Sequence, residues 1–252
     1  MRNGIFPVFT KGRVLKKESI EYLRDFPLDL ATLAWEDYSD GVLFGFSVSC
    51  QDGCIHIAKG ALKYRGIIII VPENSVEIEE FGELLHIKLV IGEYSQTEDY
   101  LFCPIEVKIS KREATAENEL ELGRFCLNPG AVLRCKYDSF SDLRTPENTL
   151  DITRVSYAGI DTPTLHPRVL HEYARALMEA SNDTVDISFA LVCFNAAVVH
   201  KVSIQWYIAK RNNVQYEEYT LPALYEKLLG MLPQQGLKER ARRPRGKGPA
   251  ID

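Results

Sequence analysis

The sequence lacks the short motifs by which common phosphate-binding and hydrolytic enzymes are recognised. It has no G-x-x-x-x-G-K-[ST] phosphate loop, since the Gly-Lys of "RGKGPA" near the end has neither a strand before it nor a helix after it. The G-x-S-x-G, H-E-x-x-H and G-x-G-x-x-G patterns are also absent. These absences exclude a phosphate-loop NTPase and leave no motif for catalysis, so we predict no catalytic residues.

The sequence also lacks the spacings of a metal site. It has no C-x-x-C pair, and His166 and His171 are five residues apart, which turns them about 140° away from each other on a helix. Cys50 and Cys54 flank a turn and could face each other across a hairpin, but the other cysteines lie in apolar contexts typical of reduced, buried thiols. We therefore predict neither metal nor cofactor.

Long apolar runs and a strong basic excess are missing as well. The longest uncharged apolar run, residues 187–199, is 13 residues, whereas a membrane span needs about 20. The N-terminus has no apolar core typical of a secretory signal. A net charge of -5 argues against a protein that coats nucleic acid. The sequence predicts a soluble protein with no membrane partner.

What is present is a change of hydrophobic period along the chain. Residues 1–40 mix turn residues, charges and one short helical period, and are predicted to form an arm that packs on another surface. From residue 41 to 160 the period is two, in short runs separated by turn signals, as expected for an antiparallel β-sandwich. The predicted strands lie within 41–49, 54–60, 62–71, 75–82, 84–92, 105–110, 119–127 and 149–157.

Residues 161–234 have helical periodicity and predict a bundle of three helices. Pro167 stands at a first helical position, followed by Leu170, Tyr173, Ala174 and Leu177 along one face. Asp183 is the predicted N-cap of a middle helix that runs from about Thr184 to Lys210, and a third helix follows. The fold class expected is therefore α+β, with an N-terminal antiparallel β-sandwich followed by a C-terminal helical bundle.

The middle helix is apolar on nearly every side, so two neighbouring helices cannot cover it. Other copies of the chain are the natural cover, although packing against the β-domain is an open alternative. The predicted oligomer interface is Ile187, Ala190, Leu191, Phe194 and Val198. The strand "IIIIV", residues 67–71, raises the same question, because its two faces are both apolar and only one can face the opposite sheet.

The last segment, residues 235–252, is predicted to be a disordered basic tail. Between Leu237 and Gly248 it holds six basic residues against one acid, together with Pro and Gly. Contact with DNA or with an acidic protein surface is an alternative function for it. The candidate polyanion contacts are Arg240, Arg242, Arg243, Arg245 and Lys247.

Four segments carry a resemblance to a known family. They are "FTKGRVLKKESIEYLRDF" in the arm, the run from Gly41 to Glu73, the strand pair "ELELGRFCLNPGA" and "TLDITRVSYAG", and "TPTLHPRVLHEYARALME" leading into the bundle. In their order they resemble the trimeric baseplate adaptor of type VI secretion systems, TssK, and the shoulder domains of phage receptor-binding proteins. Lys16 and Lys17 stand where the family usually has Pro-Gln-His-Phe.

The resemblance implies a non-enzymatic homotrimer in a baseplate. Its arm and sandwich would bind baseplate wedge proteins, and its bundle would face a distal tail fibre or receptor-binding protein. The wedge contacts on the arm are then Gly12, Val14, Leu15, Glu18 and Leu23. The secretion-system protein continues into a further domain, so we expect this shorter chain in the tail baseplate of a phage or phage-tail-like particle, made in the bacterial host cytoplasm.

Two competing readings remain beside the basic tail, and one of them is an enzyme whose site is spread over loops. A free-standing receptor- or carbohydrate-binding protein would carry its specificity on the loops of the sandwich. Only two tryptophans, Trp35 and Trp206, are present for stacking on sugar rings. The mass of the protein in solution separates these readings, because the adaptor requires an oligomer.

Overall fold

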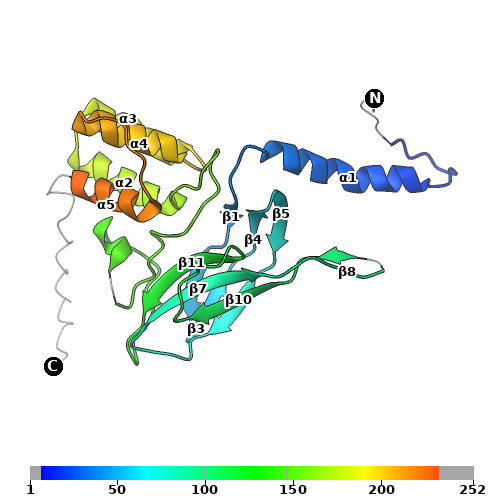
Figure 1. Ribbon diagram of the computed structural model, residues 1–252, viewed down its shortest axis with the longest axis horizontal. Coiled ribbons are helices and arrows are strands. Elements are labelled where there is room, and N and C mark those ends of the chain that lie inside the picture. The colour runs from blue at the N-terminus through cyan, green and yellow to red at the C-terminus, as the bar shows by residue number, and fades with distance from the viewer. Residues whose placement is uncertain (1–6, 99, 146, 233–252) are drawn as a thin grey trace, which may run out of the picture.

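Strands and helices alternate little along this chain, since most strands precede most helices. The computed structural model describes residues 7–98, 100–145 and 147–232, and within them it shows a mixed α+β fold (Figure 1). The α+β class expected from the sequence is thereby confirmed. The helices are Lys17–Ala34 (α1), Pro167–Ala180 (α2), Thr184–Asn195 (α3), Lys201–Asn212 (α4) and Leu221–Met231 (α5), with a short 3-10 turn at Ser141–Arg144 (η1).

The strands are short and pair antiparallel throughout the described residues. They form three sheets of three strands, in the orders β1-β4-β5, β2-β3-β6 and β10-β7-β11, and a small β8-β9 hairpin. Their bounds are Gly41–Gly45 (β1), Val48–Gln51 (β2), Cys54–Ile57 (β3), Gly60–Tyr64 (β4), Ile67–Val71 (β5), Asn74–Glu77 (β6), Leu84–Ile91 (β7), Ser95–Gln96 (β8), Leu101–Phe102 (β9), Ile105–Ser110 (β10) and Glu119–Cys126 (β11).

The turn between β4 and β5 fixes the register of that pair. Arg65 and Gly66 both have positive φ, 49° and 79°, as the two central residues of a type I′ hairpin turn require. Tyr64 therefore lies opposite Ile67, and Lys63 lies opposite Ile68. The run predicted as one strand over 62–71 is thus a hairpin, because this turn bends the chain back at its middle.

The strand predicted over residues 149–157 is wrong. This segment makes only isolated bridges, at Thr149, Asp151 and Tyr157. Thr153 bonds the side chain of Asp151 through both its backbone N–H and its hydroxyl. Such a local side-chain turn competes with a regular strand ladder, and alternation of apolar residues does not reveal it.

One continuous hydrophobic core runs from the sheets into the helices. It contains the inward side chains of β7, such as Ile87 and Leu89, and the inward side chains of α2 and α5. Phe140, in the irregular segment before η1, is fully buried between Tyr173 of α2 and Tyr225 of α5, with ring centroids 5.1 and 4.9 Å away. Two predictions about organisation stay predictions. They are the division of the chain at residues 40, 160 and 234, and the arrangement as a sandwich followed by a bundle.

Helix α2 begins where the sequence predicted, at Pro167, and buries the predicted face of Leu170, Tyr173, Ala174 and Leu177. Helix α3 is capped as expected, because the Asp183 carboxylate accepts hydrogen bonds from the N–H groups of the second and third helical residues. The first residues of these two helices are set by neighbouring residues, so they can be predicted from the sequence.

The single helix predicted from Thr184 to Lys210 is wrong, since the structure has two helices, α3 and α4, and the C-terminal helices are four rather than three within the described residues. The break at 196–200 is held by distant partners. The Thr164 hydroxyl donates to the Val199 carbonyl over 2.6 Å, and the Ile160 N–H donates to Nδ1 of His200 over 3.0 Å. These bonds hold the chain extended where its composition favours a helix.

His166 caps α2 and makes a pH prediction possible. Burial, together with nearby Arg168 and His171, lowers the pKa of His166 to about 3, and its Nδ1 accepts the Arg168 N–H. Between about pH 6.5 and pH 3, His166 of the unfolded chain carries a proton that His166 of the native state does not. Stability therefore falls as pH drops from about 6.5 towards 3, by up to about 1.4 kcal/mol per pH unit from this group.

We expect His166→Asn, which keeps an N-cap acceptor, to reduce the loss of unfolding free energy between pH 6.5 and 4. Urea denaturation at a series of pH values measures it. Glu179→Gln, at an exposed position on the same helix, is the matched control and should keep the slope of the unaltered protein. Equal slopes for His166→Asn and the unaltered protein would contradict the assignment.

Candidate interaction surfaces

Helix α1 is an amphipathic helix with no buried residue. Its large apolar side chains recur at spacings of three and four residues, which gathers them on one side of the helix. They are each between 48% and 68% exposed. We call this row, Ile20, Leu23, Phe26, Leu30 and Leu33, the arm stripe. Side chains of this size gain about 1.5–3 kcal/mol each on full burial, so the stripe favours a protein that covers it.

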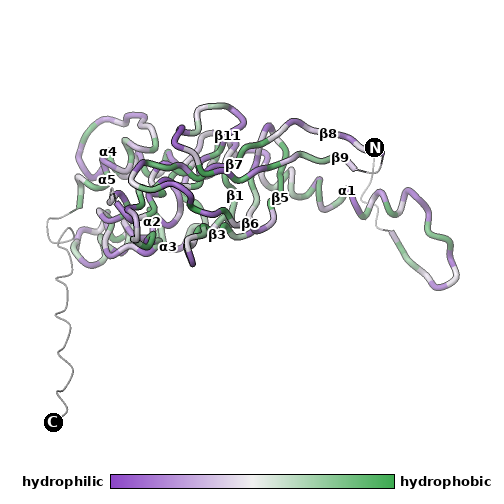
Figure 2. The backbone as a smooth tube through the Cα atoms, turned by 90° about the horizontal axis from the view of Figure 1, so that it is seen from below, coloured by the Kyte–Doolittle hydropathy of each residue, from purple (hydrophilic) through white to green (hydrophobic). Residues whose placement is uncertain are grey.

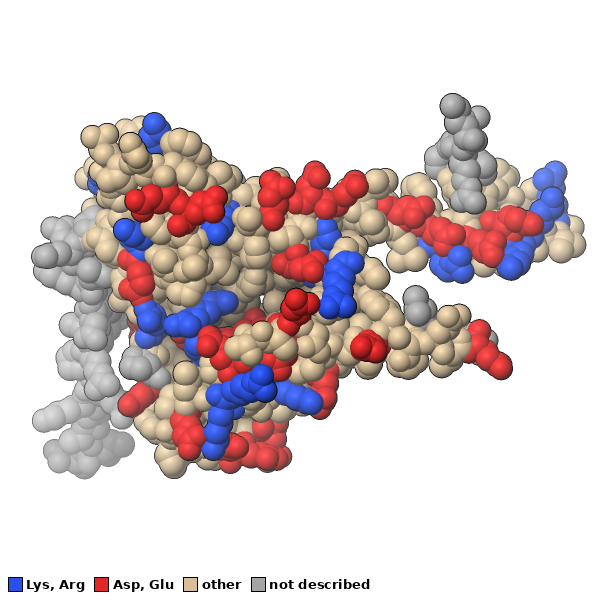
Figure 3. Space-filling view, viewed as in Figure 1, with Lys and Arg blue, Asp and Glu red and all other residues tan. Residues whose placement is uncertain are grey.

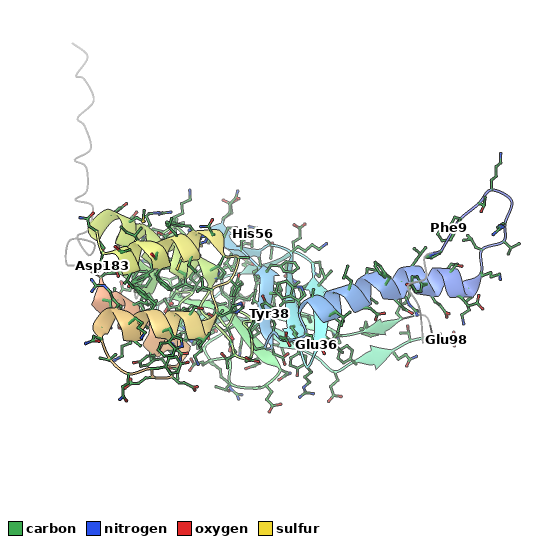
Figure 4. All side chains as sticks on the ribbon, turned by 90° about the horizontal axis from the view of Figure 1, so that it is seen from above. Phe9, Glu36, Tyr38, His56, Glu98 and Asp183 are labelled. Carbon is green, nitrogen blue, oxygen red and sulfur yellow. The ribbon has the colours of Figure 1, made fainter. Side chains whose placement is uncertain are left out.

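The arm projects from the body, with Phe9 near its far end and Glu36 and Tyr38 at its base (Figures 1 and 4). Its charges are segregated along its length. Residues 11–17 hold four basic residues and no acid, whereas residues 25–40 hold five acids and no basic residue. The acidic row along α1 is visible in Figure 3. The arm thus has a basic tip and an acidic base.

Pro27 lies inside α1, where its ring removes the backbone N–H that would bond the carbonyl of Leu23. Because no residue of α1 is buried, tertiary packing does little to compensate this loss within the chain. The sequence prediction stopped at a short helical period through Leu23. It missed the second half of the helix and with it Leu30 and Leu33, although their spacing from Leu23 was readable.

Lys63 of β4 fixes the base of the arm. It is only 8% exposed, and its ammonium donates to the carbonyls of Trp35, Glu36 and Tyr38 over 2.8, 2.8 and 2.6 Å. These carbonyls follow the C-terminus of α1, where a helix leaves acceptors without backbone partners and favours positive charge. All three N–H groups of the lysine are used. Sequence reasoning did not single out Lys63, because its partners lie 25–28 residues away.

The predicted wedge contacts all lie exposed on the arm. Gly12 has a φ of +85° in the turn before α1, Val14 and Leu15 follow it, and Leu23 belongs to the arm stripe. Glu18 lies on the opposite side of the helix from Leu23, so one flat partner surface cannot contact both. Their role in wedge binding stays a prediction.

A second exposed apolar surface lies on the hairpin of α2 and α3. The two helices are joined by three residues and run antiparallel, so positions equally far from the loop lie opposite each other. His171 lies beside Phe194, with ring centroids 6.1 Å apart, and the same antiparallel spacing puts Met178 level with Ile187. Ile187, Leu191 and Phe194 recur every three to four residues on one side of α3. We call Met178, Ile187, Leu191 and Phe194 the α2–α3 seam.

The structure places the five predicted interface residues in two different environments. Ile187, Leu191 and Phe194 lie on the seam, where the last two are close to half exposed. Ala190 has no exposed surface, so its prediction as an interface residue is wrong: it faces the core of its own chain. Val198 lies in the connector between α3 and α4 and packs against that same core. Met178 was missed, because the face predicted for this helix, through Leu170, Tyr173, Ala174 and Leu177, does not include it.

Buried charges on the outer face of the β10-β7-β11 sheet compensate one another. His86 and Lys88 of β7 lie opposite Arg124 and Glu121 of β11. The Arg124 guanidinium donates to Glu121 over 2.7 Å, and His86 Nδ1 lies 3.2 Å from the same carboxylate. Lys88 pairs with Glu119 over 3.0 Å, a bond that lowers the pKa of Glu119. With no nucleophile among these groups, we interpret the network as structural.

His56 and Ser75 come closest to a base beside a nucleophile. They are cross-strand neighbours on β3 and β6, with His56 Nδ1 2.7 Å from the Ser75 hydroxyl. No carboxylate orients the imidazole in the part of the chain that the structure describes, whereas a catalytic triad needs one. No group of three metal-binding side chains occurs in that part either.

Two further predictions concern a membrane span and the basic tail. Over residues 7–98, 100–145 and 147–232, every helix is too short or too polar to cross a bilayer. The basic tail, with Arg240, Arg242, Arg243, Arg245 and Lys247, lies outside the described residues. Polyanion binding by the tail therefore stays a prediction.

No protein-family model and no curated protein matches this chain. Among solved structures it is similar to a crystal structure of TssK, with 10% identity and a TM-score of 0.38, over 94% of this chain and 70% of that chain. It is also similar to a chain of the type VI secretion TssK-TssF-TssG baseplate subcomplex solved by cryo-electron microscopy, with 9% identity and a TM-score of 0.39, over 91% and 98% of the two chains. Similarities of this size do not identify a function.

We expect Lys63→Met to loosen the base of the arm, because it removes the ammonium that bonds three carbonyls, of which only that of Trp35 keeps a backbone donor within the described residues, the Tyr38 N–H. The free energy of unfolding should fall by about 1–3 kcal/mol. Hydrogen exchange of the amides from Leu30 to Tyr38 should accelerate at least tenfold. Lys59→Met, at an exposed position of the neighbouring loop, is the control and should change neither quantity. Unchanged exchange in Lys63→Met would show that the lysine does not hold the arm.

Proposed function

We propose that this protein is a non-enzymatic structural component of the baseplate of a contractile phage tail or phage-tail-like particle. In this proposal it is a homotrimeric adaptor that links wedge proteins to a distal fibre or receptor-binding protein. The four resembling sequence segments support the baseplate setting. The observation that carries the adaptor role is the pair of separate exposed apolar surfaces, one on the arm and one on the helices.

The α2–α3 seam is the proposed trimer contact. It offers a row of large side chains on two rigid, capped helices, which suits packing between copies better than a loop does. The exposed His171 at one end and the Arg175–Glu172 ion pair on α2 give this apolar row a polar border. An apolar centre with a polar rim is the usual anatomy of a protein interface.

The arm stripe is the proposed contact with the wedge. Helix α1 leaves its apolar face exposed. The side chains on this face recur every three or four residues, which is the spacing found in amphipathic helices that bind hydrophobic grooves. Lys63 fixes the base of this helix, so the direction of the arm is set before the partner arrives. The acidic polar face of α1 favours a groove with basic rims over an anionic membrane surface.

The arm prediction is tested by replacing two stripe residues while keeping the helix. We expect Leu23→Gln with Leu30→Gln to leave a folded protein that no longer copurifies with the wedge proteins of its particle. Glutamine preserves helix propensity, and both side chains are already exposed, so stability should change by less than about 0.5 kcal/mol. Glu21→Gln with Asp29→Asn on the polar face is the control. Normal copurification of the stripe variant would overturn the role of the arm.

The seam prediction concerns mass in solution. We expect Leu191→Asp with Phe194→Asp to abolish the trimer, as measured by light scattering, while the chain still folds and unfolds cooperatively, because both positions are exposed in the single chain. Ala190→Glu, in the core of the same helix, should unfold at a lower temperature than this variant. Val202→Asp, exposed on α4 and away from the seam, is the matched control. Trimers in the double variant would contradict the proposed contact.

A further inference from the structure

Strand β5 is an edge strand without the usual protection. It pairs with β4 alone, and its five residues are all β-branched, with no charge, proline or bulge among them. Ile67 and Ile70 are 46% and 64% exposed. Natural proteins normally interrupt such an edge with a charge or cover it, since an unpaired apolar strand recruits another strand. The outer edge of β5 therefore has no strand partner within the described residues.

The β4–β5 turn decides which backbone groups face outward. In a two-residue hairpin the pair next to the turn, Tyr64 and Ile67, is hydrogen-bonded, and bonding alternates from there. Ile67, Ile69 and Val71 thus bond β4. The N–H and C=O groups of Ile68 and Ile70 point away from it, and they make no backbone hydrogen bond within the described residues. The edge offers two donors and two acceptors.

The sequence around β5 is self-complementary about Ile69. An antiparallel pair of two β5 strands centred there puts Ile68 of one copy opposite Ile70 of the other, so all the outward groups bond each other. The same register puts Arg65 level with Glu73 of the other copy, once at each end. The Arg65 guanidinium lies over the Tyr64 ring and forms its one ion pair within the described residues with the highly exposed Glu117, over 3.3 Å. Its backbone N–H donates to Asp40. Glu73 has no ion pair within the described residues. The apolar centres of the two strands and the opposite charges at their ends therefore match in one register.

The edge of β5 is flanked by the arm, whose helix α1 contacts this strand, and by the β8-β9 hairpin (Figure 1). The arm and the β8-β9 hairpin leave the sheet in the same direction past β5, with Glu98 near the hairpin tip, and a gap separates them (Figures 1, 3 and 4). A two-fold axis normal to the sheet at Ile69 sets the two arms antiparallel.

We propose that two copies of this chain associate edge to edge through β5, which joins their β1-β4-β5 sheets into one six-stranded antiparallel sheet. The occupant of the edge is a second copy, because its register satisfies every outward group and both flanking charges at once. This contact is separate from the α2–α3 seam, so a trimer formed there would be joined to another trimer here. It does not depend on the adaptor role.

The test is a charge swap made in the Leu191→Asp, Phe194→Asp background, where the seam is disabled. In that background we expect a species of twice the 28.6 kDa chain mass by sedimentation equilibrium. Arg65→Glu alone and Glu73→Arg alone each set like charges against each other and should raise the dissociation constant at least tenfold. The double swap restores opposite charges and should restore the dimer. A monomer at 100 μM concentration in the background protein, or a double swap no better than the singles, would overturn the proposal.

The register is tested by disulfide trapping. Ile69 faces its own symmetry mate in a non-hydrogen-bonded pair, about 4.5 Å between Cα atoms, which suits a disulfide. Oxidised Ile69→Cys should run as a covalent dimer on a non-reducing gel. Ile70→Cys, which faces Ile68 of the other copy, should not, and the unaltered chain controls for the native cysteines. Equal trapping of both variants, or of neither, would refute this pairing.

Discussion

The hydrogen bonds of the Lys63 ammonium are the constraint on which the placement of the arm depends. A single side chain from the central strand of the β1-β4-β5 sheet holds three carbonyls at the base of α1. The rest of α1 buries no residue, so without this anchor its direction would rest on the small cluster around Leu43, Ala61 and Ala158, to which Trp35 and Tyr38 contribute. A buried cation is held only because its partners satisfy it fully.

The same sheet connects the two proposed contacts of this region. Its central strand carries the anchor, and its outer strand is the unprotected edge. The continuous core then extends from the sheets to α5, so these surfaces and the α2–α3 seam are carried by one packed body. Packed interiors deform little, so a load that reaches the base of the arm is passed on to the helices.

Sequence reasoning succeeded where the determining chemistry is local. The start of α2 at Pro167, the cap of α3 at Asp183 and most strands follow from spacing and from nearby polar groups. It failed where distant residues decide, since Thr164 breaks the predicted long helix from 35 residues away. It also failed at Asp151, where a local side-chain turn competes with the strand that apolar alternation predicts. In α3, which is apolar on most sides, periodicity could not tell inward Ala190 from outward Leu191, so the predicted interface mixed the two.

Pro27 has a consequence for how the arm meets whatever it binds. A helix that lacks one backbone hydrogen bond bends most easily at that turn, since the carbonyl opposite the ring has no partner to hold it. The half of α1 next to Lys63 keeps its orientation, while the outer half can tilt about a hinge at Pro27. Misalignment between neighbouring parts of an assembly would then be absorbed at one residue, and the sheet beneath would stay undistorted.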